Sequence, residues 1–296
     1  MKLGDSSEDQ LISRVTRRLV QQEDVLVGPG DDCAVITLPS GDLQLLKTDC
    51  VVEGVHFYPN ESGERVGWKA IARVVSDIAA MGGTPHAFVV TLVLTPDTTV
   101  DWLDALYVGM QKCADAFQLS IVGGETSSAP TGSANVISVA ATGHVQASKL
   151  VLRSTCNVAD AIYLTGKLGG SLVGKHLDFI PRLQPAQWLV ENCKPSAMMD
   201  LSDGLAKDLP RMAKLSDVSY EVDLSSIPCS KNCTINQALS DGEDYELLFT
   251  VSPDMVERLG SDWPSSFPPL ARIGIVKEPS IPPTKLDGGW EHFSRP

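Results

Sequence analysis

The stretch Gly28-Pro29-Gly30-Asp31-Asp32-Cys33-Ala34 decides how we interpret this chain of 296 residues. Glycine and proline favour a tight turn, and this turn presents two adjacent carboxylates before an apolar segment over 34–36. Two neighbouring negative charges repel each other, so the pair is costly unless a cation binds it. Mg²⁺ prefers oxygen ligands and completes its shell with water and substrate phosphates. The stretch therefore predicts one part of a magnesium site.

Further acidic segments recur along the chain, and the apolar pattern predicts them as turns at strand ends, apart from Ser76-Asp77, which falls within the helix predicted over 66–81. They are Thr48-Asp49, Ser76-Asp77, Gly123-Gly124-Glu125-Thr126, Asp200-Leu201-Ser202-Asp203-Gly204 and Gly242-Glu243-Asp244. Each one alone has an ordinary explanation as a helix N-cap, a turn or a solvated surface. Strand ends converge in space, so the repetition favours a single site in which several carboxylates meet.

Composition excludes several classes of function. The 37 acidic and 24 basic residues give a formal net charge of −13, which argues against binding to nucleic acid or to an anionic membrane. The seven cysteines are scattered, and we expect reduced thiols in a cytoplasmic protein. No apolar run approaches the ~20 residues that a membrane span needs. The sequence also lacks a P-loop, a Gly-x-Ser-x-Gly elbow and a His-Glu-x-x-His motif.

The hydrophobic pattern predicts a mixture of helices and strands. Helices are expected after the capping box at 7–10 and over 66–81, 100–117 and 186–192, and strands over 42–47, 87–94, 119–122, 135–143, 161–166, 197–199, 220–224 and 245–251. The helix after Gly204 contains Pro210, so it should begin late, near Lys207, or kink. The mixed order favours an α+β fold. A polar stretch over 146–159 predicts a domain boundary, which gives domains 1–147 and 148–296.

Two residues keep more than one interpretation. Asp77 lies off the apolar face of its predicted helix, and a surface ion pair with Arg73, worth about 0.3–0.5 kcal/mol, explains it as simply as a site does. His56 lies in an acidic segment and fits either a core position or a substrate contact. The other four histidines are predicted to have no role in the site; they are His86, His144, His176 and His292.

Taken together, the acidic segments resemble the thiamine-monophosphate kinase family, within the superfamily of aminoimidazole ribonucleotide synthetase. The likeness includes Gly54-Val55-His56-Phe57 and Asp77-Ile78-Ala79-Ala80-Met81-Gly82, and it runs from about Leu3 to Phe293. It implies a two-domain synthetase-like fold, with an N-terminal mixed or antiparallel sheet used in dimerisation and a C-terminal α/β domain. It also implies a homodimer that transfers the γ-phosphoryl group of ATP to thiamine monophosphate with several Mg²⁺ ions.

The resemblance also assigns roles by motif position. The metal ligands would be Asp32, Thr48, Asp49, Asp77, Glu125, Asp200 and Asp203; the ATP contacts would be Gly124, Glu125, Arg153 and Ser202; and His56 and Glu243 would face the thiamine phosphate. No residue is assigned as a general base, because a phosphate acceptor with a second pKa of about 6 is largely dianionic at neutral pH. Phosphoryl transfer asks the protein mainly for positioning and charge neutralisation.

The chain departs from the family pattern at several places. Glu125 stands where the pattern usually has Asp, and Lys47 stands at a position that is often small and polar, where its charge would replace part of the charge of a cation. The segments 170–185 and 225–241 are shorter than expected, which affects contacts with the acceptor. Two alternatives remain open: another ATP-using enzyme of the superfamily, such as a selenophosphate or aminoimidazole ribonucleotide synthetase, and a non-catalytic acidic cation-binding protein.

Overall fold

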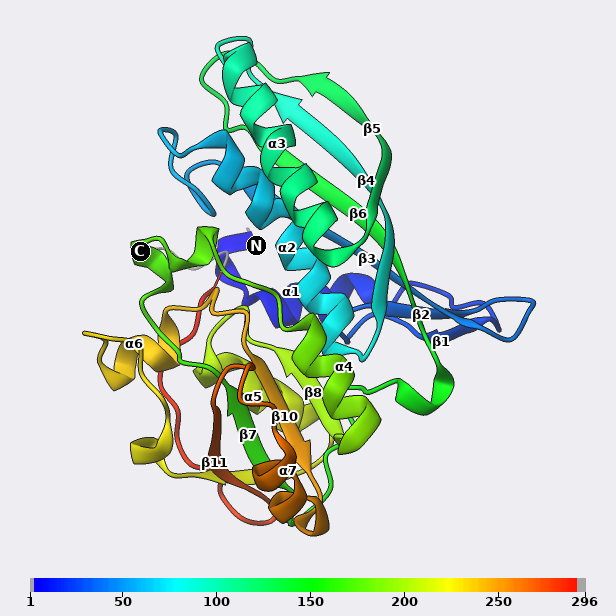
Figure 1. The fold of residues 1–296 in the computed structure, drawn as a ribbon, viewed down its shortest axis with the longest axis vertical. Helices are drawn as coiled ribbons and strands as arrows, with labels where there is room; N and C mark the ends of the chain where they lie inside the picture. The colour runs from blue at the N-terminus through cyan, green and yellow to red at the C-terminus, as the bar shows by residue number, and fades with distance from the viewer. Residues whose placement is uncertain (1–2, 292–296) are drawn as a thin grey trace.

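The computed structural model describes residues 3–291, which form two sheets with helices packed around them (Figure 1). The first sheet has the strand order β1-β2-β3-β6-β4-β5, and only its β4–β5 pair is parallel. Its strands are β1 (Val25–Val27), β2 (Ala34–Thr37), β3 (Leu43–Val52), β4 (Thr84–Leu94), β5 (Ser120–Ser128) and β6 (Val136–Val145).

The second sheet has the order β8-β10-β7-β11-β9, and all of its pairs are antiparallel. Its strands are β7 (Ala161–Thr165), β8 (Ala197–Asp200), β9 (Ser219–Val222), β10 (Leu247–Val251) and β11 (Leu270–Lys277). The two sheets and their helices confirm the predicted α+β fold class. The division into domains at residue 147 remains a prediction.

The α-helices of the described chain are α1 (Glu8–Thr16), α2 (Gly63–Ala80), α3 (Val100–Phe117), α4 (Leu183–Asn192), α5 (Leu205–Leu215), α6 (Ile235–Ser240) and α7 (Val256–Asp262). Short 3₁₀ turns cover Leu3–Asp5, Ala147–Lys149, Ser171–Val173, Lys175–Leu177, Leu224–Ser226 and Pro253–Met255. None of the helices formed by residues 3–291 combines the length and the apolar character that crossing a membrane requires.

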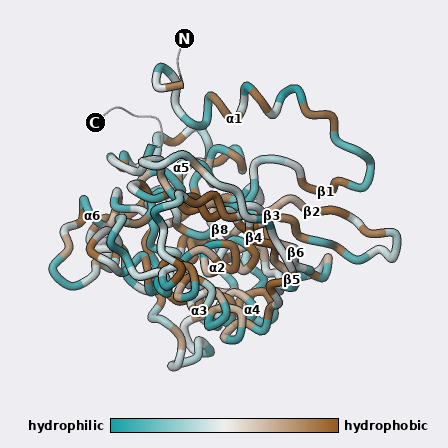
Figure 2. The backbone as a smooth tube through the Cα atoms, turned by 90° about the horizontal axis from the view of Figure 1, so that it is seen from above, coloured by the Kyte–Doolittle hydropathy of each residue, from teal (hydrophilic) through white to brown (hydrophobic). Residues whose placement is uncertain are grey.

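Helix α2 lies at the centre of the molecule, between the first sheet, α3, α4 and β8. Val66, Ile71 and Val75 on this helix are fully buried. Gly67 faces α3 so closely that a Cβ atom there would overlap the Leu106 carbonyl, so glycine allows the two helices to cross in contact. Figure 2 shows the hydrophobic segments gathered around β4 and β8 in the interior. Because α2 is buried on most sides, its polar side chains must find partners inside the protein.

Several predicted boundaries are wrong, and the longest errors fall on β3 and β5. The predicted turn at Thr48-Asp49 lies inside β3, which continues to Val52 because it pairs with β6 along its whole length. The segment 123–126 likewise lies inside β5. Gly124 pairs with Val90 there, and a Cβ atom at Gly124 would overlap the Val90 carbonyl. Gly124 therefore permits close strand pairing where the sequence suggested a turn.

Helix α5 does not begin late as its proline suggested. It starts at Leu205, with Pro210 in its interior. Proline removes one helical hydrogen bond, but Leu205, Leu209 and Met212 are almost completely buried on one face of the helix. The burial of that apolar face outweighs the missing bond. The predicted capping box of α1 is confirmed, and the Thr99 side chain caps α3 by accepting the backbone N–H of Trp102.

Candidate functional site

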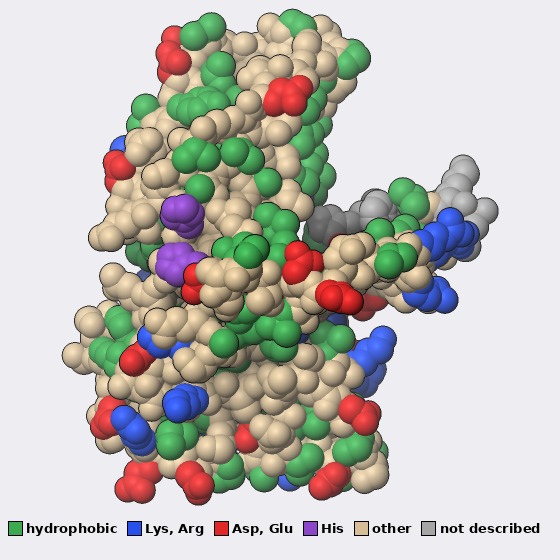
Figure 3. Space-filling view, turned by 90° about the vertical axis from the view of Figure 1, so that its right-hand side faces the viewer, with side chains coloured by type: hydrophobic (Ala, Val, Ile, Leu, Met, Phe, Trp, Pro, Cys, Tyr) green, Lys and Arg blue, Asp and Glu red, His purple; other side chains and the backbone are tan. Residues whose placement is uncertain are grey.

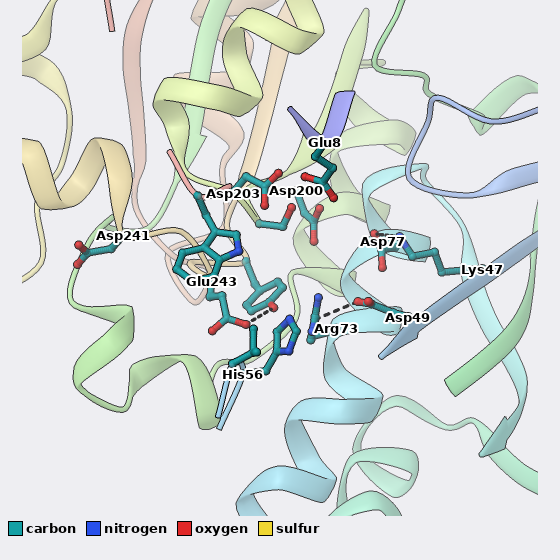
Figure 4. A pocket seen from close by; sticks show the side chains of 14 residues that line it. Glu8, Lys47, Asp49, His56, Arg73, Asp77, Asp200, Asp203, Asp241 and Glu243 are labelled. Atoms are coloured by element: carbon teal, nitrogen blue, oxygen red, sulfur yellow. Dashed lines mark hydrogen bonds and ion pairs between the residues drawn. The ribbon is translucent and has the colours of Figure 1, made fainter. Parts of the chain in front are cut away.

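A cavity of about 230 Å³ lies between the two sheets (Figure 4). Its walls come from β3, α2, the segment after β8 and the segment before β10. The lining residues are Glu8, Lys47, Asp49, Val55, His56, Arg73, Asp77, Asp200, Ser202, Asp203, Asp241, Glu243, Tyr245 and Trp290. Seven of these residues were assigned to the site through the family resemblance. They are Asp49, His56, Asp77, Asp200, Ser202, Asp203 and Glu243.

Three buried carboxylates meet at one end of the cavity. Asp32, Asp77 and Asp200 each offer an oxygen, and these atoms lie within 4.8 Å of one another. Burial and the charge of Asp32 raise the pKa of Asp200 to about 6. The hydrogen bond that Ser76 Oγ donates to Asp200 Oδ2, at 2.6 Å, acts in the opposite direction and lowers this pKa. Burial also raises the pKa values of Asp32 and Asp77. The charge of Asp31 raises the pKa of Asp32 further, and the charge of Asp200 raises that of Asp77. A divalent cation would relieve this repulsion.

The donor atoms fit a magnesium ion. Asp32 is 3% exposed, and its Oδ2 atom has no hydrogen-bond partner among residues 3–291. A buried carboxylate oxygen without a partner is costly, and carboxylate oxygens are ligands that Mg²⁺ takes. The cluster therefore has the right chemistry to hold one or more such ions.

Basic side chains surround the carboxylates. Lys47 Nζ lies 2.7 Å from Asp77 Oδ1, and Arg73 Nε lies 3.0 Å from Asp49 Oδ2. Arg153 forms an ion pair with Asp32 and donates its backbone N–H to Asp31 Oδ2 at 3.1 Å. The interpretation of Asp77 as a surface partner of Arg73 is wrong, because Asp77 is 7% exposed and pairs with Lys47.

The segment after β8 is held in place by a second buried carboxylate. Asp208 Oδ2 accepts the backbone N–H groups of Ser202 and Asp203, at 3.1 and 3.0 Å. Arg211 and Lys207 on the same helix reach Asp203 Oδ2 at 2.5 and 3.1 Å. Helix α5 therefore fixes both the backbone of this segment and the side chain of Asp203, a predicted metal ligand.

The other end of the cavity is built around the fully buried Lys69. Its Nζ lies 2.8 Å from Glu243 Oε2, 2.7 Å from the His56 carbonyl oxygen and 2.6 Å from His176 Nδ1. Burial lowers the pKa of Lys69 to about 8, although the charge of Glu243 opposes the shift. Burial alone would raise the pKa of Glu243, but the His176 hydrogen bond and Lys69 lower it well below its usual range. Glu243 is therefore a fixed negative charge at neutral pH.

The backbone around Glu243 is strained. Glu243 has φ 51° and Tyr245 has φ 52°, a left-handed region that non-glycine residues seldom occupy. The Tyr245 hydroxyl donates to Glu243 Oε1 at 3.2 Å, and its ring stacks on Phe179 with centroids 3.9 Å apart. Strain of this kind persists only where surrounding contacts over-determine it, and it often marks functional sites.

Some predicted site residues do not line the cavity, and Asp32 is one of them, although it belongs to the carboxylate cluster with Asp77 and Asp200, which do. Thr48 is on β3 between Lys47 and Asp49, and alternation along the strand turns its side chain to the opposite face. Gly124 and Glu125 are on the exposed strand β5, in a separate shallow depression with Tyr107. Arg153 does not line the cavity but reaches it through Asp32. The roles assigned to these residues remain predictions.

The sequence missed Lys69, Arg73, His176 and Tyr245 as parts of the site. One signal was present, because residues 69, 73, 76 and 77 put a polar stripe at helical spacing on an otherwise apolar helix. His176 had been predicted to have no role, but it is buried against Lys69 and Glu243. No sequence pattern links it to those two residues, which lie in distant segments.

Comparison with known proteins gives a consistent assignment. Residues 30–145 match the family model of the AIR synthase related protein, N-terminal domain. The thiamine-monophosphate kinase of Rhodopirellula baltica is 34% identical over 288 residues, covering 91% of this chain and 89% of that protein. The thiamine-monophosphate kinase of Bacillus subtilis is 33% identical over 300 residues, covering 92% of this chain and 91% of that protein.

Solved structures agree. The structure of AaThiL complexed with AMPPCP and TMP has a TM-score of 0.85 and 28% identity, and covers 99% of both chains. The hydrogenase maturation protein HypE in complex with ATP, at 19% identity and a TM-score of 0.69 over 90% of this chain and 86% of that one, shares the fold alone. Given its carboxylate cluster and its likeness to these kinases over most of its length, the chain belongs to the thiamine-monophosphate kinase family.

Proposed function

We propose that this protein transfers the γ-phosphoryl group of ATP to thiamine monophosphate, giving thiamine diphosphate and ADP. The observation that carries the proposal is the meeting of Asp32, Asp77 and Asp200 within 4.8 Å. Charge neutralisation is what phosphoryl transfer chiefly requires. Relatives named for this activity, and the ATP analogue and TMP bound by AaThiL, supply the substrate class.

The carboxylate end of the cavity would hold the phosphates and their metal. Asp32, Asp77 and Asp200 would bind Mg²⁺, with Asp49 and Asp203 at the same walls. Thr48 and Glu125 complete the proposed metal ligands, and Gly124, Glu125, Arg153 and Ser202 the proposed ATP contacts. Bound Mg²⁺ would neutralise the negative charge on the phosphate oxygens during phosphoryl transfer. Arg153 and Lys47 add fixed positive charge at this end.

The Lys69 end of the cavity suits the acceptor. Thiamine monophosphate carries a cationic thiazolium ring as well as its phosphate, so the ionised Glu243 fits the cationic part of the molecule. His56 stands beside Glu243 in the cavity and, with its pKa lowered to about 4 by burial and the charge of Arg73, is neutral at physiological pH. Neither residue needs to remove a proton, because the acceptor phosphate is itself largely dianionic.

We also propose a homodimer formed through the first sheet. Helices α2 and α3 cover one face of that sheet, and hydrophobic side chains are exposed on its strands, as the green atoms of Figure 3 show on the side where the sheet lies. Among them Leu46, Val89 and Val122 are 44%, 42% and 63% exposed. Apolar patches of this kind commonly mark interfaces. A partner there would also lie near Gly124 and Glu125 on β5. The expected cytoplasmic location stays a prediction.

The test is an ADP-release assay with ATP and Mg²⁺ in which thiamine monophosphate is compared with thiamine, and the product is identified by mass. Thiamine diphosphate formed only from the monophosphate is the expected result. Nucleotide binding without phosphorylation of either compound would overturn the proposed acceptor, and the search would move to other substrates of the superfamily. A cation-binding protein without catalysis would show no shift of its thermal midpoint with ATP.

A further inference from the structure

Lys47 occupies an unusual place for a basic side chain, because it projects from β3 into the carboxylate end of the cavity (Figure 4). Its Nζ lies 2.7 Å from Asp77 Oδ1, a distance typical of a charge-assisted hydrogen bond. The side chain is only 22% exposed. The ammonium group therefore sits at an oxygen that the proposed function assigns to a divalent ion.

The three carboxylates of the cluster have different partners. Asp200 accepts a hydrogen bond from Ser76, and Asp32 is paired through one oxygen with Arg153. The other oxygen of Asp32, its buried Oδ2, has no partner within the described chain. Asp77 is held by Lys47. The cluster thus presents one side already neutralised by a lysine and another side with a free oxygen.

A lysine ammonium and a divalent ion cannot share the same oxygen lone pairs at close range, because like charges repel and each needs the space. Lysine is a compact point charge with three donors, well suited to both a carboxylate and a phosphate oxygen. A lysine fixed here would supply positive charge at any concentration of metal.

We propose that Lys47 is a fixed cation of the phosphate site. Its ammonium group takes the place of one divalent ion at Asp77, and divalent metal binds on the side of the cluster formed by Asp32 and Asp200. The inference rests on the proposed function, since it assumes that the cluster binds divalent ions. It adds that this chain binds one divalent ion fewer than it would with a neutral residue at position 47.

The experiment counts bound Mn²⁺ by electron paramagnetic resonance, with a non-hydrolysable ATP analogue present and no acceptor. Lys47→Met is expected to bind one Mn²⁺ more per chain than the wild type, and Asp77→Asn in that background should remove the additional ion. Lys149→Met is the matched control, because it deletes a lysine from the exposed pair with Glu191 and should leave the count unchanged.

Equal numbers and affinities of Mn²⁺ in the wild type and in Lys47→Met would overturn the inference. A folded Lys47→Met protein that binds fewer ions would overturn it as well, since Lys47 would then only support the cluster. Circular dichroism checks folding, and Lys47→Ser provides a second neutral variant if the methionine disturbs packing. Because no acceptor is used, the count is independent of whether thiamine monophosphate is the substrate, which the product assay decides.

Discussion

At the scale of single residues, substitutions of Asp32 and Asp77 should affect activity and stability differently. Asp32→Asn and Asp77→Asn each remove a negative charge from the proposed metal cluster without removing core packing, so we expect turnover to fall more than ~100-fold while the fold is retained. Asp32→Asn also relieves repulsion within the cluster, so its thermal midpoint in EDTA should equal or exceed that of the wild type. Steady-state kinetics and thermal unfolding measure the two effects.

The matched control for these variants is Asp104→Asn, which changes an exposed carboxylate of α3 and should leave turnover intact. Near-normal activity of either cluster variant at saturating Mg²⁺ would contradict the assigned roles.

The lowered pKa of His56 predicts that the free energy of unfolding depends on pH. Burial and the charge of Arg73 lower its pKa from 6.5 to about 4, and its Nδ1 accepts the Val52 N–H at 3.1 Å. The unfolded chain therefore binds a proton at pH 5 that the folded chain does not, so acid destabilises the fold through this group. Its contribution is present above pH 6.5, and about 2 kcal/mol of it should be lost between pH 7 and pH 5.

Urea unfolding of the wild type and His56→Gln at pH 7 and pH 5 measures that contribution. The difference in unfolding free energy between the two proteins should shrink at pH 5, because glutamine does not titrate. A pH-independent difference would show that the imidazole is not held neutral in the folded state.

At the scale of elements, α2 connects the two ends of the cavity. It carries Lys69 at the acceptor end and Asp77 at the carboxylate end, about two turns apart. Lys69→Met would leave Glu243 buried with one basic partner fewer. Breaking such a buried pair costs about 3 kcal/mol or more, and the strained segment around Glu243 should loosen, which raises KM for thiamine monophosphate.

Chemical denaturation and kinetics test the Lys69 variant against Lys112→Met, which removes an exposed pair with Glu64 and should cost no more than about 1 kcal/mol. A Lys69→Met protein as stable as that control, with an unchanged KM, would mean that Lys69 positions nothing.

Strand β5 carries the departure from the family pattern at Glu125. The residue is exposed on the strand, so Glu125→Asp should change stability by less than about 0.5 kcal/mol. If aspartate suits the proposed contact as well as glutamate does, activity should be preserved or raised. Kinetics at several Mg²⁺ concentrations would measure this, and a large loss would show that the site is built around the longer side chain.

The elements also show what sequence can predict. Helix α3 was predicted to the residue, and α2 was predicted with its start three residues late, because an apolar stripe at helical spacing is a strong local signal. The turns expected at Asp49 and Gly124 were wrong, because pairing with β6 and β4 extends those strands and no local signal reports a partner strand. Of the site, the carboxylates were predictable from their motifs. Lys69 and His176 were not, because only the fold brings their segments together.

At the scale of the whole molecule, the exposed apolar face of the first sheet predicts self-association. Sedimentation should give a dimer of the 31.7 kDa chain. Leu46→Glu combined with Val89→Glu places charges on that face and should give a folded monomer. Val158→Glu changes a residue of similar exposure outside the sheet and should remain dimeric. A wild type that sediments as a monomer would overturn the interface.

The two ends of the described chain meet at the cavity. Lys207 Nζ pairs with Glu8 at 3.0 Å and donates to the Trp290 carbonyl oxygen at 2.6 Å, and both Glu8 and Trp290 line the cavity wall. A ribosome must therefore synthesise the chain as far as Trp290 before the pocket can close. A polypeptide that ends before Trp290 therefore lacks one wall of the cavity, even where its carboxylate cluster has assembled.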